Sequence, residues 1–412
     1  MSEAEEISLA DRFAALPRLR PVLDAVAAVR DGRAVYLVGG TVRDILLGEP
    51  GFDVDLAVEA DGVRFAEALA GRLGGRVRSH DAFGTAVVEH GDGERVDVVT
   101  ARRERYEAPA ALPVVEPGTI DDDLARRDFT INAMAASLAG DDLGRLVDPF
   151  RGRVDLEART IRVLHDGSFV DDPTRIFRAI RYASRLGFTL DEHTLDLARR
   201  AIEGGLVARL TPARLRDELV LLLDEPHAPE SIRRLGALGP DSRRAAHEDA
   251  AALFECLRVL RDEYAPGIPS WRLGLAAVAH ELGEESRPWL DRLALRRQDA
   301  EAIAAAVTAG PRIAEELRET TAPADVVALV EPYAEDAPLF ALALTGAPAL
   351  REYFERLRDV RLEVDGTDLA GLGLEESPRV GEVLAELRRR KLNGELDGRD
   401  SELEAARELL AQ

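Results

Sequence analysis

Apolar and polar residues follow three patterns along the chain, and the changes fall near residues 30 and 150. Over residues 1–29 the apolar side chains recur at helical spacing. From about residue 33 to residue 150 the pattern shifts to short apolar or alternating segments separated by glycines, which is typical of strands. Beyond about residue 155 helical spacing returns and continues to the end. The patterning predicts a small domain of helices and strands, followed by a long helical arm.

The expected strands are short, and they cover residues 34–38, 53–58, 86–89 and 95–100. The last two flank the sequence His90-Gly91-Asp92-Gly93-Glu94, which favours a hairpin. A short helix is expected over residues 42–47, directly after a Gly-Gly pair. Residues 103–123 combine prolines, a glycine and several acidic residues, so we expect a mobile loop there.

Two helices of the arm begin with a polar residue followed by proline, at Asp172-Pro173 and Thr211-Pro212. This arrangement is typical of a helix N-terminus. The first of these helices is expected to end near Leu186. The others are expected over residues 215–223, 250–262, 271–282, 298–309 and 350–362, and a final pair follows a glycine-rich stretch at 364–378.

Composition narrows the classes of protein to consider. The chain has 412 residues, of which 46% are hydrophobic and 32% charged, as in folded globular proteins. Its single cysteine, Cys256, excludes an intrachain disulfide and a cysteine-based zinc cluster. The acidic N-terminus and the lack of a long apolar run predict no signal peptide, no membrane span and a cytoplasmic location. A net charge of −23 argues against a general polyanion-coating protein but leaves room for a local basic groove.

The segment from Leu37 to Asp44 carries the first chemical signal. An apolar strand leads into Gly39-Gly40, where the absence of side chains lets backbone N–H groups approach an anion. A helix N-terminus follows and favours the same anion. Arg43 adds a positive charge that suits a phosphate.

A second signal comes from three aspartates. Asp53 and Asp55 are two residues apart on a strand, so their carboxylates face the same side and suit Mg²⁺. Asp97, on a later strand, is placed to complete a two-metal site that activates a hydroxyl and stabilises a pyrophosphate leaving group. A lone Gly-Gly is usually a turn, and a lone Asp-X-Asp is usually a solvated strand face. Their succession within about 20 residues is far more specific.

This succession of motifs resembles the class II tRNA nucleotidyltransferases and poly(A) polymerases, within the polymerase-β-like nucleotidyltransferases. Residues 122–134 (DDLARRDFTINAM) are similar to the second signature of that family. Residues 148–156 and 171–182 (DDPTRIFRAIRY) are similar to the segment before the neck and to the base-reading helix. The resemblance is strong over residues 33–225 and weaker in the tail, at 365–369 and 380–384.

The resemblance implies an α+β fold: a polymerase-β-like nucleotidyltransferase head with a small five-stranded mixed sheet, then an all-helical neck, body and tail. The implied segments are residues 1–150 for the N-terminal helix and catalytic head, 151–225 for the neck, 226–355 for the body and 356–412 for a tail that contacts tRNA. The implied cofactor is Mg²⁺, and the implied partners are ATP, CTP and tRNA.

The resemblance also implies roles for individual residues. The triphosphate would be held by Gly39, Gly40 and Arg43, and Mg²⁺ by Asp53 and Asp55, with Asp97 as the third catalytic carboxylate. The nucleotide would further contact Arg127, Asp128 and Asn132, the last two at its ribose. Its base would be read by Asp172 and Arg175, supported by Arg178 and Arg181.

The chemistry of the base edge agrees with such a reader. An aspartate accepts a hydrogen bond from the exocyclic amine of cytosine or adenine, and an arginine donates to their ring acceptors. One Asp172–Arg175 pair therefore accepts C and A while disfavouring G and U. The alternative is that Asp172 only caps the helix. Both roles are compatible, because a carboxylate has two oxygens.

The implied activity is template-independent addition of CMP and/or AMP to the 3′ end of tRNA, with release of pyrophosphate. The alternatives are addition of A alone or of C alone, poly(A) tailing, transfer to a small molecule, and an inactive RNA-binding relative. The intact aspartates disfavour the last of these. Asp171 stands where the family usually has Glu, and Pro173 resembles specialised A-adding relatives. Candidate tRNA contacts are the basic residues at 388–391 in the tail and Arg185, Arg214 and Arg216 in the neck. The alternative for the tail cluster, equally favoured, is a solvated helix end.

Overall fold

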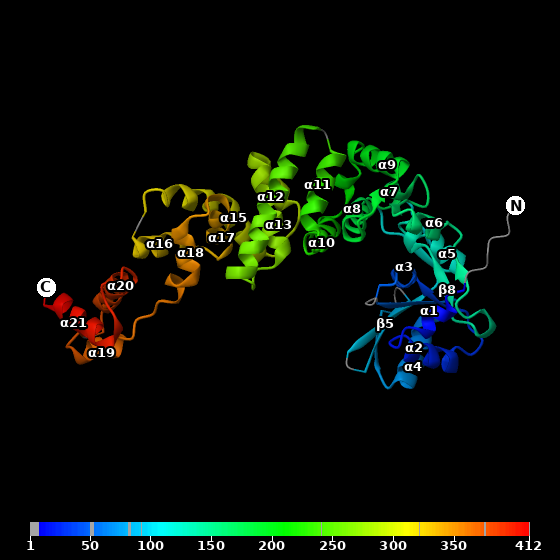
Figure 1. The fold of residues 1–412 in the computed structure, drawn as a ribbon, viewed down its shortest axis with the longest axis horizontal. Coiled ribbons are helices and arrows are strands. Elements are labelled where there is room, and N and C mark those ends of the chain that lie inside the picture. Colours follow the sequence, from blue (N-terminus) through cyan, green and yellow to red (C-terminus); the bar gives the residue numbers. More distant parts are fainter. Residues whose placement is uncertain are drawn as a thin grey trace. The chain divides into compact units, whose positions relative to one another are not determined.

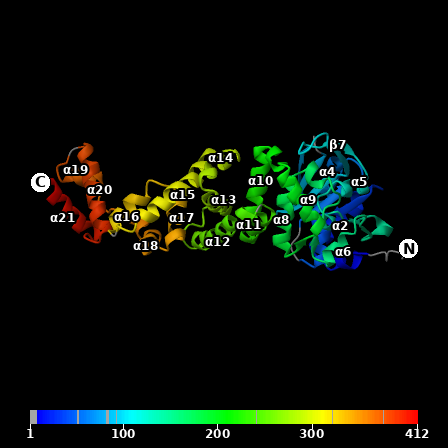
Figure 2. The same cartoon turned by 90° about the horizontal axis from the view of Figure 1, so that it is seen from above.

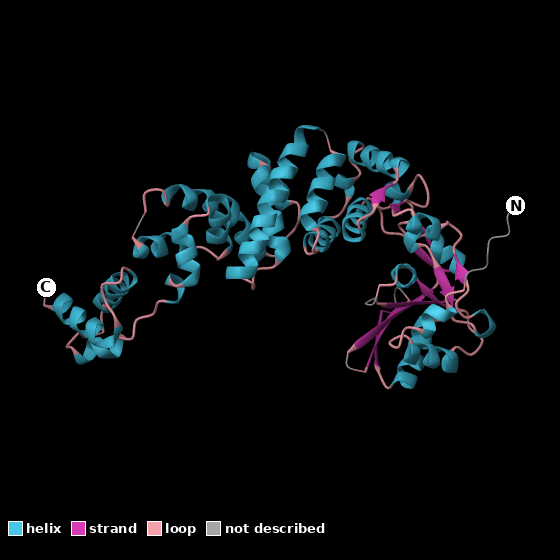
Figure 3. Ribbon diagram, viewed as in Figure 1, coloured by secondary structure: helices cyan, strands magenta, loops and turns pink. Residues whose placement is uncertain are grey.

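The computed structural model describes residues 8–49, 53–80, 84–91, 93–239, 241–320, 322–374 and 376–411. The chain divides into two compact units, Met1–Leu215 and Arg216–Gln412, with the division inside helix α10 (Pro212–Leu223). The described strands all lie in the first unit, and the described part of the second is built of helices (Figure 3). The four-part division into head, neck, body and tail stays a prediction.

A seven-stranded mixed sheet forms the centre of the first unit (Figure 1). Its strands lie in the order β3 (Arg76–His80), β4 (Thr85–His90), β5 (Glu94–Thr100), β2 (Val54–Val58), β1 (Val35–Val38), β8 (Ala135–Ser137) and β9 (Leu146–Val147). Strands β2 and β5 are parallel, and the other neighbours are antiparallel. The mixed sheet is confirmed, but the expected count of five strands is wrong. The four expected ranges correspond to β1, β2, β4 and β5, and β3, β8 and β9 have no expected counterpart. Strands β8 and β9 are only three and two residues long, too short to leave an alternating pattern.

The N-terminal segment contains two helices, α1 (Ala10–Ala14) and α2 (Arg20–Val29), rather than one continuous helix. Pro17 lies between them, and proline in a helix interior removes a hydrogen bond and clashes with the preceding turn. Helix α2 packs against α4 (Gly62–Leu73), the crossover between β2 and β3. The part of the expected helix over residues 1–7 lies outside the described residues.

The segment expected as a mobile loop, 103–123, is mostly regular structure. Strands β6 (Arg102–Arg105) and β7 (Val114–Pro117) pair in an antiparallel hairpin, and α5 (Ile120–Ala125) follows. A capping box starts α5: the Thr119 side chain accepts from the backbone N–H of Asp122, whose carboxylate accepts from that of Thr119. The prediction of a loop over 103–123 is wrong because polar strands and a helix cap contain the same residue types as a loop.

The remaining elements of the first unit lead from the sheet into helices. They are α3 (Gly40–Leu47), α6 (Gly152–Glu157), β10 (Thr160–Ile161), α7 (Ser168–Asp171), α8 (Thr174–Leu186), β11 (Thr189–Leu190) and α9 (Glu192–Glu203), with 3-10 turns at Thr130–Asn132, Gly140–Asp142 and Val207–Arg209. Helix α8 buries Ile176, Ala179, Ile180 and Ala183 on one face, as its apolar spacing predicts. Its opposite face is left for the arginines considered below.

The second unit is a succession of packed helices. They are α11 (Ala228–Leu238), α12 (Asp241–Tyr264), α13 (Ser270–Glu281), α14 (Ser286–Asp291), α15 (Arg297–Glu316), α16 (Pro323–Val330), α17 (Asp336–Thr345), α18 (Pro348–Glu355), α19 (Gly366–Gly371), α20 (Pro378–Leu392) and α21 (Gly398–Leu410), with 3-10 turns at Gly283–Glu285 and Leu357–Asp359. Helices α12, α13, α15 and α17 pack on one another in sequence (Figure 2). The single helix expected over 350–362 instead ends at Glu355, where Arg356 leaves the helical conformation. No helix in the described part of the chain has the length and apolar character to cross a bilayer.

Candidate active site

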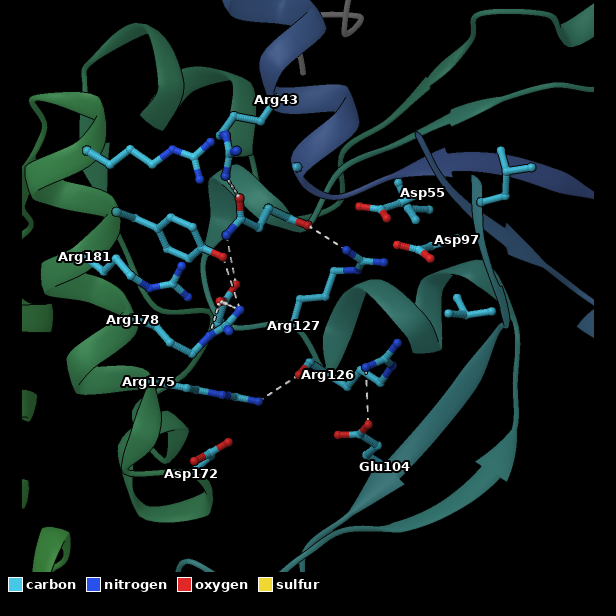
Figure 4. A pocket seen from close by; sticks show the side chains of 18 of the residues that line it. Arg43, Asp55, Asp97, Glu104, Arg126, Arg127, Asp172, Arg175, Arg178 and Arg181 are labelled. Atoms are coloured by element: carbon cyan, nitrogen blue, oxygen red, sulfur yellow. Dashed lines mark hydrogen bonds and ion pairs between the residues drawn. The ribbon is translucent and has the colours of Figure 1, made fainter. Parts of the chain in front are cut away.

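A cavity of about 440 Å³ opens in the first unit between the sheet and α8. Of the thirteen site residues predicted from sequence, eleven line it: Gly40, Arg43, Asp55, Asp97, Arg127, Asp128, Asn132, Asp172, Arg175, Arg178 and Arg181. Gly39 lies in sequence between the lining residues Val38 and Gly40, and Asp53 lies two residues before Asp55. Figure 4 shows Asp55 and Asp97 on one side of the cavity and Asp172 with Arg175 on the other, with Arg127 between them.

The Gly39-Gly40 turn connects β1 to α3. Gly39 has φ +62°, a left-handed conformation that other residues adopt only with strain. A Cβ at Gly39 would lie 2.2 Å from Nη1 of Arg127, so the glycine also lets that side chain approach the turn. Gly40 begins α3 and lines the cavity. The N-terminus of the helix therefore lies at the cavity wall, where it favours binding of an anion.

Arg43 is buried at the cavity wall and is held by two partners. Its Nη1 donates to Oδ1 of Asn132 at 2.7 Å, and its Nε donates to Oδ1 of Asp44 at 2.8 Å. The guanidinium therefore keeps a fixed position without a ligand. A preorganised donor of this kind favours phosphate binding, because little side-chain entropy remains to be lost.

Strand register brings two of the three predicted carboxylates together. Asp55 on β2 is the direct partner of Asp97 on β5 in the parallel pair. Burial, then Asp97 and Asp53, raises the pKa of Asp55 to about 6, although Arg127 and Arg43 oppose the shift. Burial also raises the pKa of Asp97, with Asp53 adding to the shift and Arg95 opposing it. The repulsion between these carboxylates creates a demand for a cation.

Asp53 is exposed and immediately precedes β2. Its backbone carbonyl accepts from Oγ1 of Thr41, and the same Oγ1 accepts from the backbone N–H of Asp55. Thr41 thereby joins α3 to the start of β2. Across the described residues, no three carboxylate, histidine or cysteine side chains lie close enough to form a complete metal cluster. Two carboxylates suit Mg²⁺ that takes its remaining ligands from phosphates and water.

Asp123 is a buried carboxylate that holds two lining arginines and was not among the predicted site residues. It is fully buried on α5, with Oδ1 accepting from Arg126 Nη2 at 2.6 Å and Oδ2 from Arg127 Nη2 at 2.9 Å. Burial alone would raise the pKa of Asp123, but the two arginines outweigh it and lower the pKa. Its spacing of three and four residues before Arg126 and Arg127 was the available signal.

Asp128 is the centre of a second buried network. Oδ2 accepts from both Nε and Nη2 of Arg178, at 2.9 and 2.6 Å, and Oδ1 accepts from Nδ2 of Asn132 and the backbone N–H of Phe129. Burial raises the pKa of Asp128, but Arg178 and the hydrogen bonds outweigh it, so the pKa is lowered. This network attaches α8 to the 126–132 segment, and the predicted contact with a ribose stays a prediction.

Asp172 and Arg175 both line the cavity, but their contacts differ. Oδ1 of Asp172 accepts from the backbone N–H and hydroxyl of Thr174, so Asp172 also stabilises the start of α8. Arg175 is buried and donates to Oγ of Ser168 and to the backbone carbonyl of Arg126, both at 2.8 Å. Arg175 thus connects α7 and α8 to the segment that carries Arg126 and Arg127.

Tyr182 orders three of the arginines around its ring. The guanidinium carbons of Arg43, Arg178 and Arg181 lie 5.5, 5.6 and 5.2 Å from the ring centroid. This distance is within the range of cation–π attraction. The lining contains seven arginines and five carboxylates, a net positive wall that suits a triphosphate.

The lining residues that were not predicted as site residues include Glu104, Tyr106 and Arg126. Glu104 on β6 accepts from Arg126 and Arg102, and from the hydroxyl of Tyr106. Burial raises the pKa of Tyr106 to about 12, with Glu104 and Asp172 adding to the shift and Arg175 opposing it. Glu104 lies on β6, within the segment whose composition predicts a loop, so no sequence pattern indicates it.

Comparison with known protein families identifies the class of protein to which this site belongs. Residues 35–162 match the family described as poly A polymerase head domain, and residues 187–239 match the family described as probable RNA and SrmB-binding site of polymerase A. These matches define a protein with a nucleotidyltransferase head followed by an RNA-binding region.

Individual relatives are more specific. An A-adding tRNA nucleotidyltransferase of Geobacter sulfurreducens is 38% identical over 90% of this chain, which spans only 44% of that relative's length. An A-adding tRNA nucleotidyltransferase of Halalkalibacterium halodurans is 33% identical, with 91% of this chain and 88% of that protein covered. A solved Thermotoga maritima CCA-adding enzyme complexed with tRNA has a TM-score of 0.79 at 31% identity, covering 98% of this chain and 99% of that one. The chain belongs to the tRNA nucleotidyltransferase and poly(A) polymerase family.

Proposed function

We propose that this protein transfers CMP and/or AMP from CTP or ATP to the 3′ end of tRNA and releases pyrophosphate. The observation that carries the proposal is the arginine-rich cavity with the Asp55–Asp97 carboxylate pair at one side and Asp172 at the other. A nucleoside triphosphate has charge at one end and a base edge at the other, which fits this polarity. The names of the relatives, A-adding and CCA-adding, support the same reaction.

The proposed cofactor is Mg²⁺, held by Asp53 and Asp55 with Asp97 beside them. When bound, Mg²⁺ increases the acidity of the attacking 3′-hydroxyl and neutralises charge on the leaving pyrophosphate. The fit rests on the parallel register that places Asp55 beside Asp97 and on the preference of Mg²⁺ for carboxylate oxygens. Burial raises the pKa of both carboxyl groups, and neighbouring carboxylates add to the shift, so a cation would stabilise their charged forms.

The chain's own residues bind and orient the nucleotide. The start of α3 at Gly40 and the fixed guanidinium of Arg43 bind the triphosphate, and Arg127 contacts the nucleotide between its two ends. Asp128 and Asn132 orient the ribose of the nucleotide. Arg178 and Arg181, ordered by Tyr182, add positive charge on the α8 side.

Base choice falls to Asp172 and Arg175. A carboxylate accepts from the exocyclic amine of C or A and repels the carbonyl oxygen that U or G presents there. Arg175 is too buried and too well bonded to swing freely, so its remaining N–H groups act from a fixed position. Recognition of tRNA rests mostly on shape and backbone contacts. Because tRNA is the proposed substrate, we also propose a cytoplasmic location.

The test is incorporation of each labelled nucleotide on three tRNAs: one lacking CCA, one ending in CC and one ending in CCA. We expect C and/or A to be added, U and G to be refused, and the tRNA ending in CCA to be inert. The pattern over the first two substrates identifies which nucleotides are added. Long A tails would point to poly(A) tailing, and no incorporation with Mg²⁺ on any of the three would overturn the proposal. The matched control is the same reaction with a chelator, which should abolish it.

A further inference from the structure

Arg214, near the start of α10, joins two segments that are distant in the sequence. Its Nη2 donates to Oδ1 of Asp172 at 2.7 Å, and its Nη1 donates to the backbone carbonyl of Ala110 at 2.9 Å. About a fifth of each side chain in the Arg214–Asp172 pair is exposed, so this ion pair is largely shielded from water. The neck arginine that the sequence suggested as a tRNA contact is thus engaged inside the first unit.

The contact decides which oxygen of Asp172 is available. Oδ1 accepts from three donors: the backbone N–H of Thr174, the hydroxyl of Thr174 and Nη2 of Arg214. Among the described residues, no hydrogen bond to Oδ2 is found. Rotation of the carboxylate would break the charge-assisted bond to Arg214. Oδ2 is therefore the oxygen left to accept from a base.

Ala110 provides independent support, because its backbone is strained. It has φ +62°, a left-handed conformation that is unfavourable for alanine. Two hydrogen bonds maintain it: its N–H donates to the carbonyl of Val170 at 3.0 Å, and its carbonyl accepts from Arg214. Strained residues persist where the surrounding contacts fix them, and they are concentrated at functional sites. The carbonyl of Ala110 thus orients the guanidinium of Arg214 toward Asp172.

We propose that Arg214 is a positioning residue for base selection, which acts by fixing the carboxylate of Asp172 so that Oδ2 faces the incoming base. This inference rests on the proposed function, because it assigns a role to the residue that reads the base. Without Arg214, Asp172 rotates and accepts hydrogen bonds in more than one orientation, and discrimination between amine and carbonyl at the base edge weakens.

The test measures kcat/KM for ATP, CTP, GTP and UTP in wild type and in Arg214→Gln. We expect the preference for C and A over U and G to fall by about 5- to 30-fold, within the range for loss of a good base contact. Arg214→Lys keeps the charge but cannot reach both acceptors with a planar fork, so we expect an intermediate loss. The matched control is Arg199→Gln on α9, which removes an exposed arginine 3.9 Å from Asp196 and should leave selectivity unchanged.

A double-mutant cycle separates positioning from direct contact. If Arg214 acts through Asp172, Arg214→Gln should have no further effect on selectivity in an Asp172→Ala background. A selectivity loss of equal size in both backgrounds would overturn the proposal, as would a folded Arg214→Gln enzyme with wild-type selectivity. A raised KM for tRNA with unchanged base preference would identify a tRNA contact instead.

Calorimetric titration with ATP and with GTP gives a second readout that needs no transfer to tRNA. We expect Arg214→Gln to reduce the ratio of their dissociation constants, while Arg199→Gln does not. If wild type binds ATP selectively but transfers nothing to tRNA, the proposed function fails and the titration still decides the role of Arg214. If Arg214→Gln does not fold, the same titration on Arg214→Lys decides it, and an unchanged ratio overturns the inference.

Discussion

Arginine is concentrated in two regions of this chain: the cavity of the first unit and the last turns of α20 in the second. In the cavity seven arginines and five carboxylates form the lining, and Arg43, Arg126 and Arg127 also pair with carboxylates outside it, Asp44 and Asp123. On α20 every basic residue at 388–391 has a carboxylate partner, namely Glu331 for Arg388, Glu386 for Arg389 and Arg390, and Glu402 for Lys391. The density of arginine in a sequence therefore does not reveal how much positive charge is available to a polyanion.

The two regions also differ in what their ion pairs stabilise. The hydrogen bonds to Arg389 and Arg390 lower the pKa of Glu386 to about 2. The side chain of Arg389 is half exposed and those of Glu386 and Arg390 are partly exposed, so water screens these pairs and reduces their contribution to stability. Glu402 is different: it is fully buried and accepts from Lys391 and from the backbone N–H groups of Glu363 and Val364. Lys391 therefore helps to hold α20, α21 and the segment before α19 together. The predicted contact of the tail with tRNA stays a prediction, and it rests on Arg389 and Arg390.

The largest effect should follow from a change in the cavity. We expect Asp55→Asn to lower kcat by about 10³-fold or more, because it removes a charged group from a set that acts as a unit. Its melting temperature should be equal to or higher than that of wild type, because the change removes a buried charge that Asp97 also repels. Steady-state kinetics and thermal melts check both points. Asp141→Asn, an exposed carboxylate of the same unit, is the control; near-normal activity in folded Asp55→Asn would remove the metal site from this cavity.

A smaller effect should follow from the tail. We expect the double variant Arg389→Glu with Arg390→Glu to raise KM for full-length tRNA by about 3- to 10-fold, a loss of one or two phosphate contacts. A minihelix without the tRNA elbow should be used as well as by wild type. Glu386→Gln releases Arg389, while Arg390 keeps Glu408 at 3.6 Å, and the change should lower KM for tRNA by about twofold at low salt.

The control for the tail is Arg297→Glu on α15, which reverses an exposed arginine paired with Glu301 and should leave KM unchanged. An unchanged KM for tRNA in the tail double variant would place the RNA contact elsewhere. Equal impairment on tRNA and minihelix would do the same.

The smallest effect is a pH dependence of stability. The pKa of Asp55 is about 6 in the folded protein, whereas it is 3.8 for the unperturbed group. Between pH 3.8 and pH 6, therefore, Asp55 is protonated in the metal-free folded state and ionised in the unfolded chain. The charge of Asp55 therefore destabilises the fold fully above about pH 6, and this penalty disappears as the pH falls toward 3.8. We expect Asp55→Asn to melt higher than metal-free wild type at pH 7.5 (roughly 1–3 °C), with a difference that shrinks below pH 6. A difference that does not change with pH would contradict the assigned cause, and Mg²⁺ should stabilise wild type but not the variant at pH 7.5.

Short-range preferences in the sequence account for the local parts of the site. The strand, the Gly39-Gly40 turn and the following helix are set by short-range preferences, and the alternation of a strand places Asp53 and Asp55 on one face. The start of α8 at Thr174, directly after Asp172-Pro173, and its apolar face were predicted for the same reason. The family resemblance then supplied roles, and eleven of the thirteen residues proved to line one cavity.

Contacts between residues that are distant in sequence depend on the tertiary fold. Asp97 pairs with Asp55 only through the parallel register of β5 with β2, and Arg214 reaches Asp172 and Ala110 across 42 and 104 residues. Two further features also depend on contacts between distant residues: the pairing of β6 with β7, and the carboxylate partners of the tail arginines. Local patterns fix backbone conformation and the face on which a side chain lies. The partner of a buried charge depends on the three-dimensional path of the chain, because many pairings of the same charges are compatible with one sequence.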